Sequence, residues 1–295
     1  MNFDDRSVER RSQPDPNVTP YRPDLAASHL RGTVEAERYA EGVRRQALRG
    51  IVPLRRGPGD SAPQLTELLY GETFTAYEEK DGWLWGQCDA DGYVGYVRAD
   101  GTAAEPVEPT HRVRALRCFL YPEPDFKISP LKALSVGARL AVVERSGAYA
   151  RIAPEGWVHE TAIEPLDAVA PDYVETAHRF LGVPYLWGGR SSLGIDCSGL
   201  VQVSLAMAGV NAPRDSYMQQ AAVGDLVDPS GAAPLRRGDI VFFPGHVGLM
   251  ADSEKLVHAT AHTMCVTVEP VADVAARTLK SDGSGIIAVR RFGGR

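Results

Sequence analysis

The stretch LGVPYLWGGRSSLGIDCSGLVQVSLAMAGV, residues 181–210, joins a polar, glycine-rich loop to an apolar segment with helical character. Asp196 or a neighbouring residue can cap that helix, because a short polar side chain accepts the first free N–H groups. Such a cap places Cys197 in the first helical turn. The partial positive charge of a helix N-terminus lowers a thiol pKa and favours the thiolate. The stretch therefore predicts that Cys197 is a nucleophile.

A thiolate nucleophile also needs a proton acceptor and donor, and two histidines in strand-like sequence are candidates. His246 opens one strand after Pro244–Gly245, and His258 follows twelve residues later in KLVHATA. Two antiparallel strands joined by the turn ADSEK would bring both side chains together. The second histidine would then orient the first. A zinc site could use the same three side chains, but a thiolate–imidazole pair with Cys197 explains them without a metal. We expect neither a metal nor a cofactor.

The chain from about residue 171 onward predicts an α+β domain. PDYVETAHRFLG predicts a helix that ends at Gly182, and SGLVQVSLAMAGV predicts a second helix. Short β-like runs follow these helices, namely DIVFFPG, HVGLMAD, KLVHATA, MCVTVEPV and IIAVRRF.

The preceding sequence predicts two small all-β barrels in tandem, both of which resemble bacterial SH3-like domains. Asp-Gly pairs at 81–82, 91–92 and 100–101 are hairpin signals. DGWLWGQCDADGYVGYV and GAYARIAPEGWVHET share a strand, a tight turn and a Gly-aromatic-Val sequence, which indicates a weak repeat.

The segment before the barrels begins polar and Pro-rich, and a rough helical spacing of apolar residues then predicts a helix over about 25–46. The patterns together divide the chain into an N-terminal arm with a helix (1–47), two SH3-like barrels (48–106 and 107–166) and the α+β domain (167–295).

Composition excludes few functions. The 295-residue chain has a net charge of −6, which argues against nucleic-acid binding. Without a run of about 18 apolar residues, we expect no membrane span. The acidic start without an apolar run predicts a cytoplasmic protein. The cysteines form no C-x-x-C pair, and we expect Cys88, Cys118 and Cys265 to be reduced and structural.

The C-terminal part of the chain resembles the NlpC/P60 family of papain-like cysteine peptidases. This resemblance covers roughly residues 171–292, and it implies a papain-like α+β catalytic domain. It rests on five stretches in compatible order, namely PYLWGG, DCSGLV, RRGDIVFF, GHVGLM and LVHATA.

The resemblance also implies a role for each matching residue. Cys197 matches the nucleophile, His246 the general base and acid, and His258 the polar residue that orients it. Asp196 matches the acidic residue before the nucleophile. Tyr185 matches the aromatic residue whose hydroxyl lies near the reacting centre.

SH3-like domains before such a domain resemble the γ-D-glutamyl-L-diamino-acid endopeptidases, also called dipeptidyl-peptidase VI. The resemblance implies a murein peptide with a free N-terminal L-Ala as substrate, cut between D-Glu and the diamino acid during recycling of cell-wall peptides. It also implies a pocket for the peptide's amine. Tyr93 matches a barrel tyrosine of this pocket, Asp215 and Ser216 match its catalytic-domain side, and Glu67 is a possible acid from the barrel.

Two other classes of function stay open. The chain could be a non-catalytic protein that binds cell-wall peptides through its barrels. The same fold could instead act as an amidase, a transpeptidase or an acyltransferase, since fold does not determine substrate. The sequence does not predict the oligomeric state.

Overall fold

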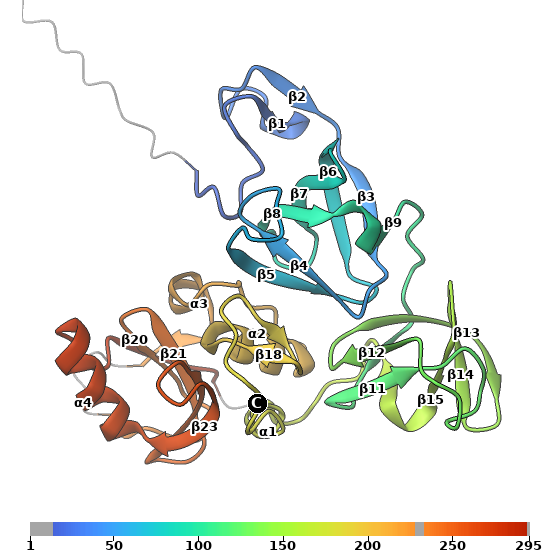
Figure 1. Cartoon of the computed structure of the whole chain (residues 1–295). Coiled ribbons are helices and arrows are strands. Elements are labelled where there is room, and N and C mark those ends of the chain that lie inside the picture. Colours follow the sequence, from blue (N-terminus) through green and yellow to red (C-terminus); the bar gives the residue numbers. More distant parts are fainter. Residues whose placement is uncertain (1–13, 228–232, 294–295) are drawn as a thin grey trace, which may run out of the picture.

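The computed structural model describes residues 14–227 and 233–293. Figure 1 shows an α+β domain with one β-barrel above it and a second beside it. The papain-like α+β fold preceded by SH3-like β-structure is therefore confirmed. The first thirteen residues of the predicted arm lie outside the described residues. Within the described part of the chain, no helix is both long and apolar enough to cross a membrane.

The helix predicted over about 25–46 is wrong. This segment has only short buried runs, and Leu25 packs against Trp85 and Val94 of the first barrel. Its backbone groups are satisfied largely by strand pairing rather than by a helix. The segment contains β1 (Leu25–Ala27), η1 (Ser28–Leu30), β2 (Arg38–Ala40) and β3 (Val43–Ala47).

Barrel 1 is a seven-stranded antiparallel sheet in the order β5-β4-β8-β7-β6-β3-β9. Its sheet therefore begins with β3, inside the segment assigned to the arm. The turn at Asp81–Gly82 joins β6 to β7 with both φ angles positive, as a tight hairpin requires. Asp100–Gly101 instead lies in η2 (Ala99–Gly101). The other strands are β4 (Ile51–Arg55), β5 (Gln64–Leu69), β6 (Thr73–Lys80), β7 (Trp83–Cys88), β8 (Val94–Arg98) and β9 (Thr102–Ala103).

Barrel 2 has a five-stranded antiparallel sheet in the order β15-β14-β13-β10-β16, with β11 and β12 paired separately. Its apolar core includes Leu120, Leu140 and Ile152, takes in Leu69 and Tyr70 from barrel 1, and is separate from the main core of barrel 1. The elements are β10 (His111–Val113), β11 (Arg117–Leu120), β12 (Lys132–Ser135), β13 (Arg139–Ser146), β14 (Tyr149–Ala153), β15 (Trp157–His159), η3 (Glu160–Ala162) and β16 (Ile163–Pro165).

The α+β domain is built on a six-stranded antiparallel sheet in the order β19-β24-β20-β21-β22-β23. Side chains of β20 (Ile240–Phe243) alternate between the two faces of the sheet. Phe242 packs in the core that contains residues of α1 (Tyr173–His178) and α2 (Cys197–Met207). Phe243 packs in the core that contains residues of α4 (Val271–Asp282). The remaining strands are β17 (Arg190–Ser191), β18 (Gly194–Ile195), β19 (Asp225–Leu226), β21 (His246–Met250), β22 (Lys255–Thr260), β23 (Cys265–Pro270) and β24 (Ala288–Arg291).

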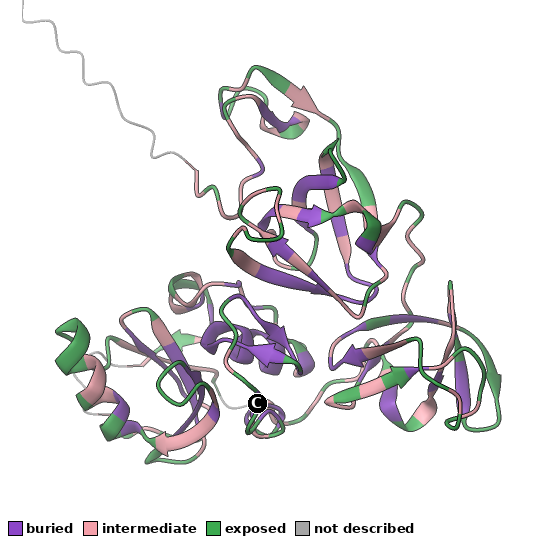
Figure 2. Cartoon of the chain, viewed as in Figure 1, coloured by how far each residue is buried: buried purple, intermediate pink, exposed green. Residues whose placement is uncertain are grey.

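The helices lie on both faces of this sheet. Helix α2 is buried over almost its whole length, whereas α4 keeps an exposed outer face (Figure 2). The first predicted helix is shorter than expected, because it ends at His178 and turns lead from there to Gly182, which has φ +79°. The helices are α1 (Tyr173–His178), α2 (Cys197–Met207), α3 (Ser216–Ala222) and α4 (Val271–Asp282).

Candidate active site

Cys197 is the first residue of α2, and Asp196 caps the helix as predicted. One Asp196 carboxylate oxygen accepts the Gly199 N–H at 2.7 Å. The backbone N–H of Val247, on β21, hydrogen bonds to the Cys197 sulfur. The thiol is therefore held between the start of the buried helix and the start of the strand that carries His246.

The two histidines lie side by side, as the strand arrangement predicted. His246 begins β21, His258 lies on the adjacent strand β22, and β21 and β22 are antiparallel. Nε2 of His246 is 2.7 Å from Nδ1 of His258. His258 is fully buried, so its ring is held firmly. Nδ1 of His246 is thereby left outside this contact.

The electrostatics contradict the expectation of a resting thiolate. Burial raises the pKa of Cys197 to about 12, with Asp196 adding to the effect. Burial also lowers the pKa of His246 to about 3 and of His258 to about 4, and the positive charge of Arg277 contributes to both. Desolvation disfavours every charged form here and outweighs the helix N-terminus. Burial therefore favours the neutral forms of the thiol and of both imidazoles.

Asp196 is bound within the protein by Arg214, a residue that the sequence analysis missed. Arg214 is 1 % exposed and contacts both Asp196 oxygens, at 2.9 and 2.6 Å. It also donates to Thr66 of barrel 1 at 2.8 Å. The second Asp196 oxygen accepts the Gly188 N–H at 2.8 Å. Asp196 thus organises the helix start, and its predicted contact with substrate stays a prediction.

Tyr93 and Asp215 meet across the boundary between barrel 1 and the catalytic domain. The Tyr93 hydroxyl donates to Asp215 Oδ2 at 3.0 Å. Burial and the Asp215 charge raise the pKa of Tyr93, which keeps the hydroxyl a donor. Asp215 precedes α3 but makes no capping hydrogen bond with its side chain, and Ser216 is the first residue of that helix. The barrel tyrosine and the Asp-Ser segment are therefore brought together.

The other two predicted residues have different surroundings. Glu67 is 4 % exposed, and its carboxylate accepts the backbone N–H of Arg190 at 3.0 Å, so it binds the catalytic-domain loop. Tyr185 is half-buried, and its pKa is raised by burial and, to a smaller extent, by the neighbouring Cys197. Its hydroxyl is thus a neutral donor in the vicinity of the thiol, while the amine-binding role of Glu67 stays a prediction.

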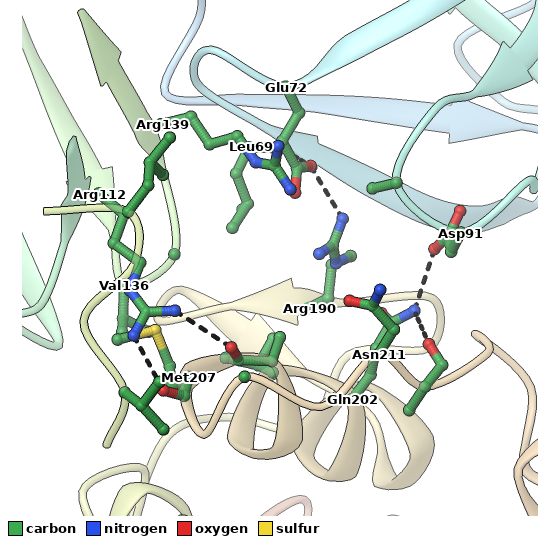
Figure 3. Close-up of a pocket in the computed structure, with 18 of the residues that line it drawn as sticks. Leu69, Glu72, Asp91, Arg112, Val136, Arg139, Arg190, Gln202, Met207 and Asn211 are labelled. Atoms are coloured by element: carbon green, nitrogen blue, oxygen red, sulfur yellow. Dashed lines mark hydrogen bonds and ion pairs between the residues drawn. The ribbon is translucent and has the colours of Figure 1, made fainter. Parts of the chain in front are cut away.

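A hollow of about 380 Å³ lies where both barrels meet the catalytic domain, away from Cys197 and the two histidines (Figure 3). Across it, Arg190 pairs with Glu72 of barrel 1 at 2.8 Å, and Gln202 of α2 donates to Asp91 at 3.0 Å. These contacts fix barrel 1 against the domain that carries Cys197.

The described residues contain no group of three or more His, Cys, Asp and Glu side chains placed to hold a metal ion. All four cysteines are free thiols.

Comparison with known proteins agrees with this architecture. Residues 182–279 match the NlpC/P60 family, and residues 54–101 match the bacterial dipeptidyl-peptidase SH3 domain. The chain is 28 % identical to the γ-D-glutamyl-L-lysine dipeptidyl-peptidase of Bacillus subtilis over 221 residues, which is 66 % of this chain and 71 % of that protein. It is 36 % identical to dipeptidyl-peptidase 6 of Lysinibacillus sphaericus over 107 residues, which is 35 % of this chain and 38 % of that protein.

A solved structure of an NlpC/P60 family protein from Bacillus cereus shares the fold, with a TM-score of 0.70 at 21 % identity. The match covers 84 % of this chain and 99 % of that one. The chain therefore shares its fold with a solved NlpC/P60 family structure over most of its length.

Proposed function

Because this chain carries an NlpC/P60 peptidase domain behind a dipeptidyl-peptidase SH3 domain, we propose that it hydrolyses the bond between D-Glu and the diamino acid in free murein peptides. The substrate would begin with an unblocked L-Ala, as in recycling of cell-wall peptides. The Tyr93–Asp215 contact is the observation that carries this proposal. The predicted cytoplasmic location belongs to the proposal, and cell fractionation would test it.

The chemistry of Asp215 suits a peptide amine. Burial raises the pKa of this carboxyl, and Tyr93 donates to one of its oxygens. An ammonium group beside the carboxylate would stabilise its charged form. Because barrel 1 supplies one wall, an acyl group on the amine would meet protein instead of a charge partner. The pocket would thus select peptides by their free N-terminus.

Acylation begins with both catalytic groups neutral. The thiol proton moves to Nδ1 of His246 as the Cys197 sulfur attacks the γ-glutamyl carbonyl carbon. The oxyanion that forms is stabilised by the Cys197 backbone N–H and by the Tyr185 hydroxyl. His246 then gives its proton to the amine of the diamino acid as the C–N bond breaks, which leaves a thioester on Cys197.

Deacylation uses the same histidine. Water loses a proton to His246 and attacks the thioester carbonyl carbon, and the proton returns to the departing sulfur. L-Ala-D-Glu leaves, and the site is neutral again. His258 keeps the His246 ring in place through the 2.7 Å contact in both half-reactions.

The test is mass spectrometry of L-Ala-γ-D-Glu-diaminopimelate and of its N-acetylated form after incubation with the full chain. We expect release of L-Ala-D-Glu from the free-amine peptide alone. Cys197→Ala should abolish release, while Cys265→Ala, which removes another free thiol, should leave it intact.

Each other result assigns a different function. Cleavage of both peptides would support the peptidase activity but contradict the proposed pocket for the free amine. Binding of the peptide without cleavage would favour the non-catalytic protein that binds cell-wall peptides. Transfer of the acyl group to an added amine in place of water would favour an acyltransferase.

A further inference from the structure

A second acidic residue lies behind the histidine pair. Nδ1 of the His258 ring contacts His246. Its other nitrogen, Nε2, is buried and has no hydrogen-bond partner among the described residues. Glu269 Oε1 is 3.7 Å from this nitrogen, and this oxygen is likewise buried and unpartnered. His258 lies on β22 and Glu269 on the paired strand β23. In this pairing Leu256 is opposite Glu269, and His258 is opposite Thr267. The two side chains are therefore diagonal neighbours on one face of the sheet.

Arg277 of α4 holds the carboxylate in this position. Its guanidinium donates to Glu269 Oε2 at 2.8 Å, which leaves Oε1 for His258. Glu269 is largely buried, with a side chain 16 % exposed. The 3.7 Å separation is longer than a hydrogen bond, but it places a carboxylate oxygen beside the free ring nitrogen, where its charge favours a proton on that nitrogen.

A neutral His258 ring carries one proton, on either Nδ1 or Nε2, and its position decides whether His246 can act as a base. If His258 is protonated on Nε2, its Nδ1 accepts the Nε2–H of His246, and Nδ1 of His246 has a free lone pair for the thiol proton. If His258 is protonated on Nδ1, it donates to His246 Nε2, and the His246 proton sits on the nitrogen that should accept. Only the first arrangement is productive.

We propose that Glu269 is a positioning residue that attracts the Nε2–H of His258 and thereby keeps His246 in the base-competent tautomer. This inference rests on the proposed role of His246 as base. The charged or titratable groups that act on the pair are Arg277 from α4, His262 from the turn after β22, and Glu269 from β23. Glu269 is the only anion among them, so it also stabilises the imidazolium that forms during the reaction.

The experiment compares Glu269→Gln and Glu269→Asp with a matched control. The amide of Glu269→Gln is neutral and can present its NH₂ group to His258. We expect kcat to fall about tenfold to a hundredfold, as for other residues that orient a functional imidazole, with KM within about twofold. Glu269→Asp keeps the charge and should recover part of the loss. The control is Glu78→Gln, because Glu78 pairs with Arg22 in barrel 1.

A second readout does not depend on the murein peptide. Alkylation of Cys197 by iodoacetamide, followed from pH 5 to 9 by peptide mass spectrometry, reports how readily the thiol gives up its proton. Glu269→Gln should slow it near pH 7 by a factor similar to that in kcat and shift its pH dependence, while Glu78→Gln leaves both unchanged.

The outcomes separate this inference from the proposed function. If Glu269→Gln slows alkylation of Cys197 but the natural sequence does not cut the peptide, the inference would be supported and the proposed substrate overturned. An unchanged rate and pH profile in Glu269→Gln would overturn the inference while peptide cleavage stands. The inference would also be overturned if the rates of Glu269→Gln fall only in proportion to its thermal stability and Glu269→Asp does not restore them.

Discussion

The two barrels share a plan but meet opposite ends of the same helix. Barrel 1 approaches the N-terminal end of α2, where Thr66 binds Arg214 and Tyr93 binds Asp215. Barrel 2 approaches the C-terminal end, where Arg112 donates to the carbonyls of Ala206 and Met207 at 3.1 and 2.9 Å. Because Cys197 is at the N-terminal end, these barrel 1 contacts lie nearer to the nucleophile than the Arg112 contacts do.

The two barrels have similar folds but make different kinds of contact with the catalytic domain. Arg112 places a cation on the carbonyl end of a helix, which is favourable wherever a helix ends. The barrel 1 contacts are instead pairs of side chains, Thr66 with Arg214 and Tyr93 with Asp215, and the proposed function assigns the second pair to the amine of the substrate. Arg112 of barrel 2 thus binds the C-terminal end of α2, while Thr66 and Tyr93 of barrel 1 bind residues near its N-terminal end.

The largest effect that would sharpen this comparison is expected from Arg214→Ala. The change leaves the 6 % exposed Asp196 carboxylate without its cation and removes the link to Thr66. Breaking a buried ion pair costs about 3–5 kcal/mol. Urea unfolding should show this loss, and kcat/KM should fall strongly because the cap of α2 is disturbed. Full activity in Arg214→Ala would mean that the cap does not depend on barrel 1.

Arg112→Ala tests the barrel 2 side. The substitution leaves helix-end carbonyls with no side-chain donor and removes the 2.8 Å contact with Glu164. We expect a loss of about 2–3 kcal/mol in the free energy of unfolding. The kcat/KM of the remaining folded protein should stay within about twofold, because Arg112 contacts the far end of α2. A large fall in kcat/KM at unchanged stability would erase the distinction between the barrels.

Acid should destabilise the catalytic domain more than either barrel. The pKa values of His246 and His258 are about 3 and 4 in the folded protein, against about 6.5 in the unfolded chain. Below pH 6.5 the unfolded chain binds more protons, so stability is present above pH 6.5 and is lost as pH falls towards 4. At pH 5 each histidine contributes a loss of about 2 kcal/mol.

Urea unfolding at pH 7 and pH 5 measures this loss, with the double variant His246→Gln/His258→Gln as control. The double variant should lose clearly less stability between the two pH values than the natural sequence. An equal loss in both proteins would assign the acid sensitivity to other groups.

The smallest expected effect is the most specific one. Tyr93→Phe removes the donor to Asp215 without changing the shape of the ring, and we expect KM for the free-amine peptide to rise about tenfold, equivalent to about 1.4 kcal/mol. Trp157→Phe alters the Gly-aromatic-Val position of barrel 2 and should leave KM unchanged. Equal effects from both variants would contradict a special role for barrel 1.

The sequence predicted the local features of the site well. A capped helix start at Cys197 and a strand pair that joins His246 to His258 both follow from short patterns, and both are present. The helix predicted over 25–46 failed because its spacing was only roughly helical and Leu25 is recruited by the barrel residues Trp85 and Val94. Tertiary packing overrides weak local preference in such a segment.

Features that depend on contacts between distant residues could not be predicted. Arg214 looks like an ordinary loop arginine, since nothing local shows that Asp196 and Thr66 surround it. The thiol pKa was predicted in the wrong direction because helix position is visible in a sequence and burial of Cys197 is not. Glu269 lies in a plain strand and gains meaning only from its distance to His258.

The fully enclosed guanidinium of Arg214 also has a consequence for how the chain is made. Ribosomal synthesis delivers Thr66 well before Arg214, so barrel 1 can fold first and present a ready partner to the later domain. A catalytic domain expressed alone would have to leave this arginine short of one partner. Cooperative folding of the whole chain, more than the fold of its last domain, would then produce a reactive cysteine.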